Sequence, residues 1–260
     1  MSFVVMTYNI RVGLGFDYKL DAHDPLKGLR RVADFIRAHQ PDIVALQEVD
    51  RFMPRTGKVD QIAWLAERLD MQFAYSPSYL GEITHAGGRA RYGNGLLTRF
   101  PIVWSESHRL FHRGWLLPAE ESWVNEPRSA LEVRVEIEGQ ALTAYSVHLS
   151  TTTDQQAIQV EQLAKVLRQV DGHQVIMGDF NCGLDAAHMA PLTVEWRSVL
   201  DAVAAPSERR LTFPSGEESR IAIDHILVSQ GVRVIRAEVI VDKEGISDHN
   251  PVLAELELAG

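Results

Sequence analysis

Apolar residues recur every three or four positions in three stretches of the chain, and this period predicts amphipathic helices. The first stretch lies between Asp24 and Pro41. Asp24 and Pro25 suit an N-cap and a first helical position, and Pro41 ends the predicted helix. The other two stretches, Ile62–Leu69 and Ala157–Val170, show the same spacing and predict two further helices.

Short runs rich in β-branched and aromatic residues lie between these helices and predict strands. Two of the runs flank Glu138-Gly139-Gln140, a sequence typical of a hairpin turn. Strands outnumber helices without a regular strand–helix–strand period, so the pattern favours an α+β or a layered α/β domain. The predicted strands are Phe3–Ile10, Ile43–Leu46, Phe73–Tyr75, Gly95–Thr98, Ile102–Trp104, Leu131–Ile137, Ala141–Val147, Val175–Met177, Ile223–Val228, Val232–Val241 and Val252–Leu258.

Composition narrows the class of protein only a little. The chain has 260 residues, of which 45% are hydrophobic and 23% charged, and this suits a globular protein with a sizeable core. No low-complexity segment or linker divides the sequence, so we expect a single domain over residues 1–260. Cys182 is the one cysteine, which excludes an internal disulfide and removes the need for an oxidising compartment.

Targeting signals are not evident in the sequence. The segment Met1–Ile10 lacks the basic start and long apolar run of a signal peptide. No stretch approaches the roughly 18 consecutive apolar residues of a membrane helix. We therefore expect a cytoplasmic protein without an integral membrane segment, and the sequence leaves its oligomeric state open.

Three irregular segments are predicted to contribute substrate contacts, because long ordered loops usually carry them. Residues 53–59 form the first segment. Residues 84–91 form the second and contain paired glycines and two arginines. Residues 108–128 form the third, in which Trp115 and Trp123 suggest an apolar wall beside a binding site or, alternatively, packing on the fold.

Polar residues able to bind metals or move protons stand at the ends of the predicted strands. Residues placed in this way can converge at one edge of a sheet, and such a cluster suits a metal and acid–base site. His225, next to Asp224 in a predicted strand, is expected to point to the opposite face. The candidate residues are Asn9, Glu48, His148, Asp179, Asn181, Asp224, Asp248 and His249.

Seven short strings surround these residues. They are Thr7-Tyr8-Asn9-Ile10, Gln47-Glu48-Val49-Asp50, Tyr92-Gly93-Asn94-Gly95-Leu96-Leu97-Thr98, Ser146-Val147-His148-Leu149, Gly178-Asp179-Phe180-Asn181, Ile223-Asp224-His225-Ile226-Leu227 and Ser247-Asp248-His249-Asn250-Pro251-Val252. In this order they resemble the endonuclease/exonuclease/phosphatase superfamily, which includes nucleases, sphingomyelinases and inositol polyphosphate phosphatases. The resemblance runs from Tyr8 to Val252, and the strings that end in Asn181 and Val252 are the most specific.

The resemblance implies a four-layer α/β sandwich (αββα), with two mixed sheets face to face and helices outside. It also implies a divalent-metal-dependent hydrolase of phosphate esters. Glu48 would be the main metal ligand, assisted by Asn9 and with Asp248 near the metal. Asp179 and Asn181 would hold the attacking water and the scissile phosphate.

The resemblance further implies a carboxylate–imidazole pair between Asp224 and His249. His148 matches the second histidine of the nuclease and sphingomyelinase branches. Repair enzymes similar to exonuclease III lack a histidine at that place, so His148 disfavours a role in abasic-site repair.

Elementary chemistry supports these roles. A hard cation such as Mg²⁺, or Mn²⁺, prefers oxygen ligands of the kind that Glu48 and Asn9 offer. Zinc is disfavoured, because no cysteine or histidine cluster has metal-binding spacing. His249 can change its charge near neutral pH, and a buried carboxylate at Asp224 would fix its tautomer. His148 and Asn181 can donate hydrogen bonds to phosphoryl oxygens.

Asn94 and Arg128 are the candidate substrate-binding residues. Asn94 lies between two glycines, which suits either a substrate contact or a turn. Arg128 leads a predicted strand and would clamp a phosphate group, the alternative being a solvated surface arginine.

Net charge bears on the substrate. The formal charge of -9 opposes broad contact with a nucleic-acid backbone, so a small phosphoester or a lipid headgroup is the favoured substrate. The alternative enzyme is a metal-dependent endo- or exonuclease on DNA or RNA, which a basic and aromatic stripe would support. A non-catalytic binding protein of the same fold is a more remote alternative, because the set of candidate residues is intact.

Overall fold

The protein's structure, a computed structural model, describes residues 1–21, 23–83, 89–113 and 126–259. Its strands form two mixed sheets of six strands each. The first sheet consists of β1 (Ser2–Asn9), β2 (Ile43–Arg51), β3 (Gln72–Ile83), β4 (Arg89–Thr98), β11 (Val232–Val239) and β12 (Val252–Leu258). The strand order is β11-β12-β1-β2-β4-β3.

The second sheet has the order β5-β6-β7-β8-β10-β9. Its strands are β5 (Ile102–Arg109), β6 (Ser129–Ile137), β7 (Gln140–His148), β8 (His173–Asp179), β9 (Arg197–Ser198) and β10 (Asp224–Val228). The helices are α1 (Lys27–His39), α2 (Gln61–Leu69), α3 (Thr153–Leu167), α4 (Ala190–Thr193) and α5 (Val199–Ala202).

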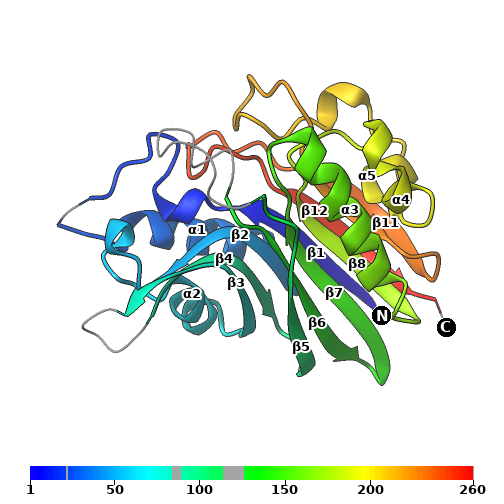
Figure 1. Cartoon of the computed structure of the whole chain (residues 1–260), viewed down its shortest axis with the longest axis horizontal. Coiled ribbons are helices and arrows are strands. Elements are labelled where there is room, and N and C mark those ends of the chain that lie inside the picture. Colours follow the sequence, from blue (N-terminus) through cyan, green and yellow to red (C-terminus); the bar gives the residue numbers. More distant parts are fainter. Residues whose placement is uncertain (22, 84–88, 114–125, 260) are drawn as a thin grey trace.

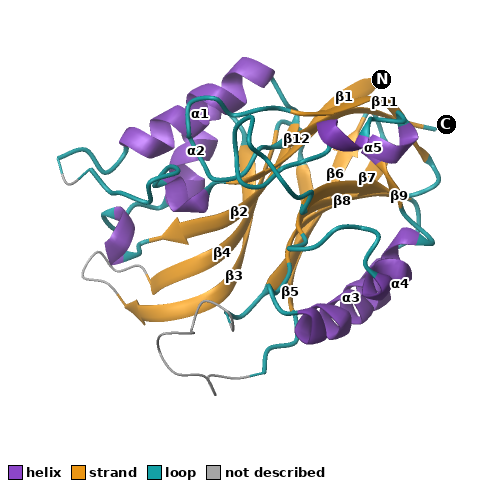
Figure 2. Ribbon diagram, turned by 90° about the horizontal axis from the view of Figure 1, so that it is seen from above, coloured by secondary structure: helices purple, strands orange, loops and turns teal. Residues whose placement is uncertain are grey.

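The sheets face each other with helices outside, as the resemblance predicts. Figure 2 shows α1 and α2 outside the first sheet, and α3 and α4 outside the second. The two chain ends lie side by side (Figure 1), at the end of β1 opposite to Asn9. The predicted αββα sandwich of two mixed sheets is therefore confirmed.

Three apolar layers stabilise this sandwich. Alternate strand residues such as Val5 and Met177 fill the space between the sheets. Ile36 and Ile62 belong to the layer beneath α1 and α2, and Leu163 belongs to the layer beneath α3. Full burial of an aliphatic side chain of this size contributes about 1.5–3 kcal/mol relative to exposure.

Each sheet contains one parallel strand pair, and these pairs decide where the site lies. β1 and β2 are parallel and joined through α1, whereas β7 and β8 are parallel and joined through α3. The other neighbouring strands are antiparallel. Because the strands of a parallel pair end at the same edge of a sheet, polar residues at those ends are brought together.

Several predicted element bounds are wrong: β3, β4 and β5 are longer than predicted, and α3 and β11 end earlier. α1 begins at Lys27 rather than at Pro25, because the Asp24 carbonyl accepts the Lys27 N–H in a turn before the helix. β2 extends to Arg51, so Glu48 lies inside the strand instead of after it.

Two of the predicted irregular segments fall partly outside the described residues, at 84–88 and at 114–125, the latter with Trp115 and Trp123. Residues 53–59 contain the 3-10 turn Pro54–Thr56. None of the helices in the described part of the chain is both long and apolar enough to cross a membrane.

Candidate active site

Three strands of the second sheet place three polar side chains in one row. In the strand register, Asp179 of β8 lies between His148 of β7 and Asp224 of β10. Residues paired in this way point to the same face of a sheet. That face is the inner one, because Met177, two residues before Asp179, belongs to the core between the sheets. His225 points the other way, as predicted, and its Nε2 contacts a backbone carbonyl of the loop after β8.

The first sheet contributes Asn9 and Glu48. Strict alternation along β2 would turn Glu48 to the same side as Leu46, which packs under α1 and α2. A β-bulge between Leu46 and Val49, with Glu48 at a φ of 56°, redirects the side chain. Its Oε1 accepts a hydrogen bond from Asn9 Nδ2 at 3.1 Å. Left-handed backbone at a non-glycine residue costs on the order of 1 kcal/mol, and such strain is concentrated at functional sites.

The Asn9 side chain links the two sheets. Its Oδ1 accepts the Arg11 backbone N–H at 3.1 Å, which identifies the other end of the amide as the donor. That donor, Nδ2, lies 3.1 Å from Glu48 Oε1 and 3.0 Å from Asp179 Oδ2. In this orientation Asn9 offers nitrogen rather than oxygen to the carboxylates. The amide therefore positions Glu48 and Asp179, while its expected role as a metal ligand stays a prediction.

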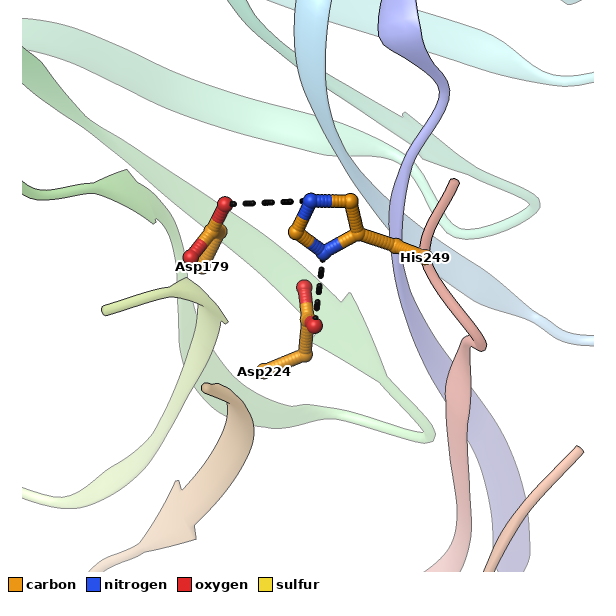
Figure 3. A group of neighbouring side chains, drawn as sticks. All are labelled: Asp179, Asp224 and His249. Carbon is orange, nitrogen blue, oxygen red and sulfur yellow. Dashed lines mark hydrogen bonds and ion pairs between the residues drawn. The ribbon is translucent and has the colours of Figure 1, made fainter. Parts of the chain in front are cut away.

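His249 and Asp224 form a buried pair at the centre of the cluster (Figure 3). His249 Nδ1 lies 2.8 Å from Asp224 Oδ2, and Nε2 lies 3.8 Å from Asp179 Oδ2. The Phe213 ring packs against the imidazole at 4.9 Å between centroids. Thr212 Oγ1 accepts the Asp224 backbone N–H at 3.1 Å. The carboxylate thus fixes the orientation of the imidazole, and its Oδ1 has no hydrogen-bond partner among the described residues.

Burial and neighbouring charges shift the pKa values in this cluster. Burial by itself would lower the pKa of His249, but the carboxylates of Asp224 and Asp179 outweigh it and raise that pKa to about 10. Burial, reinforced by Asp224, raises the pKa of Asp179. Burial also raises the pKa of Glu48, against the effect of the hydrogen bond from Asn9. The carboxylates around His249 therefore favour its charged imidazole, whereas burial disfavours the charged form of Glu48.

His148 lies beside positive charges, whereas His249 lies beside carboxylates. Its Nδ1 lies 3.1 Å from Arg128 Nη1, and its Nε2 lies 3.5 Å from Asp179 Oδ2. Burial and the positive charges of Arg128 and His249 hold the pKa of His148 well below its usual value. Arg128 is only 5% exposed and also forms an ion pair with Glu126 at 3.2 Å. Arg128 therefore reaches the cluster through His148 and is not a solvated surface residue.

Asp248 and Asn181 flank the cluster. Asp248 Oδ2 lies 3.1 Å from Arg11 Nε, and its Oδ1 lies 3.9 Å from His249 Nε2. The Asn181 backbone N–H donates to Asp179 Oδ1 at 2.9 Å. Asp248 is therefore held by an arginine beside the imidazole, and Asn181 orients Asp179.

Two groups of side chains suit a divalent cation. Asp179, Asp224 and His249 offer ligand atoms within 4.8 Å of one another, but the charged imidazole already neutralises part of this group. Glu48 has no salt bridge among the described residues, and the Asp248 charge adds to the rise in its pKa. Carboxylate oxygens fit Mg²⁺ or Mn²⁺, and a cation bound by Glu48 with Asp248 nearby stays a prediction.

Asn94 makes its hydrogen bonds between the two sheets rather than with the cluster. Its Nδ2 donates to the Ser129 carbonyl at 2.7 Å and to the Ser146 carbonyl at 3.4 Å. The residue is 1% exposed, and its Oδ1 has no partner among the described residues. These contacts join β4 to β6 and β7, and a substrate contact at Asn94 stays a prediction.

Replacement of Asn94 by alanine is expected to lower the free energy of unfolding by about 1–3 kcal/mol, because two buried carbonyls lose their donor. Urea denaturation measures this loss, and steady-state kinetics on the same variant separates stability from binding. An increase in KM with unchanged stability would instead make Asn94 a substrate contact.

Three further residues border the cluster, although the sequence pattern does not single them out. Arg11 pairs with Asp248 and follows Asn9 by two residues. Burial of Tyr92 together with the Glu48 charge raises the pKa of its hydroxyl. Arg55 lies over the Tyr92 ring at 5.0 Å. The sequence signals that could have identified them are the place of Arg11 directly after the first motif string and of Tyr92 as the first residue of the third.

The sequence matches the profile of the Endonuclease/Exonuclease/phosphatase family over residues 6–249. The chain belongs to this family. Its members are phosphoesterases and nucleases that typically depend on divalent metals. A UPF0294 protein of Vibrio cholerae serotype O1 is 32% identical over 143 residues, which cover 53% of this chain and 48% of that protein. The match therefore spans about half the length of that relative.

Solved structures of the endonuclease/exonuclease/phosphatase family share the fold. An endonuclease/exonuclease/phosphatase from Beutenbergia cavernae superimposes with a TM-score of 0.72 and 23% identity, covering 100% of this chain and 72% of that one. A mannosyl-6-phosphatase of Bacteroides thetaiotaomicron gives a TM-score of 0.70 at 20% identity, with 98% and 100% of the two chains covered.

Proposed function

We propose that the protein hydrolyses phosphate esters with a divalent cation, by in-line attack of a water molecule. The observation that carries this proposal is the Asn9 amide, which contacts Glu48 at 3.1 Å and Asp179 at 3.0 Å. It brings a candidate metal ligand and a candidate base together across the two sheets. Adjacent carboxylates of this kind suit cation binding and water activation.

In this mechanism Glu48 and Asp248 would hold the cation, which would supply polarisation of the phosphoryl oxygens and neutralisation of leaving-group charge. Asp179 accepts a hydrogen bond from the attacking water and takes up its proton. Its raised pKa suits a base that works closer to neutral pH than an ordinary aspartate does. The Asn181 N–H holds Asp179 Oδ1 in place during this step.

The two histidines stabilise negative charge as it develops on the phosphoryl group. His249 is charged, and its Nε2 lies on the side of the ring opposite to the Asp224 contact. His148 presents its Nε2 beside Asp179. Fixed donors aimed at developing charge in a buried site typically contribute on the order of 10²–10³ in kcat each.

A small phosphoester or a lipid headgroup is the substrate class we favour over duplex nucleic acid. The net charge of -9 disfavours wide contact with a phosphate backbone. The loop after Asn9 also exposes apolar side chains: Phe16 is 49% and Tyr18 44% exposed. Tyr18 packs against Arg11, which in turn pairs with Asp248. An aromatic surface beside the site suits a compact or amphiphilic ligand.

The test compares substrates under one set of conditions. Purified protein with Mg²⁺ or Mn²⁺ is expected to hydrolyse bis-p-nitrophenyl phosphate and to leave plasmid DNA intact at low salt. Phospholipid headgroup diesters and an abasic duplex complete the panel, and Glu48→Gln protein controls for contaminating enzymes. Plasmid nicking at low nanomolar protein that Glu48→Gln abolishes would replace our substrate class with a nuclease. Absence of metal-dependent turnover on the whole panel would contradict the proposed function.

A further inference from the structure

Arg128 has a contact that a phosphate-binding arginine does not need. Its Nη1 lies 3.1 Å from His148 Nδ1, and both side chains are at least nine-tenths buried. On its other side the guanidinium forms the ion pair with Glu126. Its Nε has no hydrogen-bond partner among the described residues. The imidazole of His148 is therefore its main partner inside the cluster.

Hydrogen-bond chemistry fixes the proton of His148. A guanidinium has only donors and stays protonated in proteins, so it cannot accept a hydrogen bond from a ring N–H. His148 Nδ1 must therefore be the acceptor, with a free lone pair. The one proton of a neutral imidazole then sits on Nε2, the atom that lies 3.5 Å from Asp179 Oδ2.

In His249, the other histidine of the cluster, Nδ1 carries a proton instead of accepting a hydrogen bond. His249 Nδ1 contacts a carboxylate, Asp224 Oδ2, which requires a proton on that nitrogen. Two histidines beside Asp179 are thus oriented by partners of opposite charge. A positive partner favours the neutral form of one imidazole and a negative partner favours the charged form of the other, so the two histidines can have different roles.

We propose that Arg128 is a positioning residue that locks His148 as a neutral imidazole with its proton on Nε2, so that His148 acts as a permanent hydrogen-bond donor and not as a proton-transfer group. Burial and the nearby positive charges, which lower the pKa of His148, favour the same state. The charged groups near the ring are Arg128, Asp179 and His249.

This inference rests on the proposed function for its catalytic meaning, but its structural content can be tested without substrate. With ¹⁵N-labelled histidine, long-range proton–nitrogen NMR distinguishes the two neutral tautomers and the charged ring. In the metal-free wild type, His148 is expected to show an unprotonated Nδ1 and a protonated Nε2 across neutral pH. The resonances are assigned by their loss in His148→Gln. A ring protonated on Nδ1, or on both nitrogens, would overturn the proposal.

Arg128→Met removes the donor and keeps an unbranched apolar side chain. The pKa of His148 is expected to rise, and the ring is expected to populate the Nδ1-protonated or the charged form. Arg128→Lys, which keeps one charge and one donor position, serves as a second variant should the methionine variant fold poorly, and is expected to preserve the tautomer. The matched control is Arg134→Met on β6, the strand that begins directly after Arg128; this arginine is solvent-exposed and pairs with Glu132. The control is expected to leave the His148 spectrum unchanged.

Kinetics separates a positioning role from direct phosphate binding. Arg128→Met is expected to lower kcat about 10- to 100-fold, as loss of a supporting hydrogen bond typically does, with KM nearly unchanged. A large rise in KM with unchanged kcat would assign Arg128 to phosphate binding and overturn the proposal.

His148→Gln provides a rescue test, because its amide can donate from near the Nε2 position but cannot transfer a proton. It is expected to retain at least about 10-fold more activity than His148→Ala. Equal loss in both variants would show that proton transfer at His148 is required. If no phosphoester is turned over but the wild-type tautomer is as expected, the proposed function fails while the role of Arg128 in fixing the ring stands.

Discussion

Replacement of Glu48 by glutamine is expected to lower kcat/KM for a metal-activated phosphodiester by on the order of 10³-fold, which corresponds to the several kcal/mol that a bound cation supplies to such a transition state. The amide keeps the shape of the side chain and its place in the β-bulge, but it lacks the charge that a hard cation prefers. Initial rates on bis-p-nitrophenyl phosphate over a range of Mn²⁺ concentrations would measure the loss.

The stability of Glu48→Gln is an internal check on that result. Burial raises the pKa of the Glu48 carboxyl, so removal of the charge in metal-free protein relieves an unfavourable state. The melting temperature is therefore expected to stay equal or to rise while activity falls. Glu67→Gln on the exposed face of α2 is the matched control and should change neither property.

Chelation gives the same test without mutation. EDTA is expected to abolish turnover by the wild type, and added Mg²⁺ or Mn²⁺ is expected to restore it. Full activity in EDTA, or a Glu48→Gln enzyme that remains fully active, would exclude a mechanism that depends on a metal at Glu48.

Replacement of Asp224 by asparagine is expected to lower kcat by about 10²–10⁴-fold, as in other carboxylate–histidine pairs. His249 loses the carboxylate charge 2.8 Å from its Nδ1, which is the largest of the charges that raise its pKa. The ring then becomes neutral or adopts the wrong tautomer, although its position is kept. Single-turnover rates, with enzyme in excess over substrate and at saturating concentration, would measure the effect on chemistry alone.

The double variant shows whether the two residues act as a unit. His249→Ala is expected to cost at least as much as Asp224→Asn, and the double variant little more than the worse single one. Additive losses would mean that each residue acts separately. His225→Gln, the next residue of β10 on the opposite face, controls for damage to the strand and is expected to affect stability more than kcat.

Most of the fold, and most of the residues that meet in the cluster, could be predicted from the amino-acid sequence. Periodic apolar residues and short apolar runs reflect burial of one face, a local property that a sequence shows directly. They predict α1, α2 and α3 and the long strands, and the order of the motif strings predicts the αββα sandwich. The same strings name Glu48, Asp179, Asp224 and His249 as candidates, and the structure brings these four together.

Which atoms of these residues face one another depends on how distant strands pack together. The β-bulge that turns Glu48 toward Asn9 breaks the alternation of a regular strand, and the sequence pattern places Glu48 after the strand instead. The Asn9 amide contacts Asp179, which lies 170 residues further along the chain, because the two sheets pack face to face. Strand alternation is set by neighbouring residues, whereas the partner of an amide or an imidazole is set by packing between distant strands. For that reason no local pattern could reveal that Arg128 faces His148 and so fixes its proton.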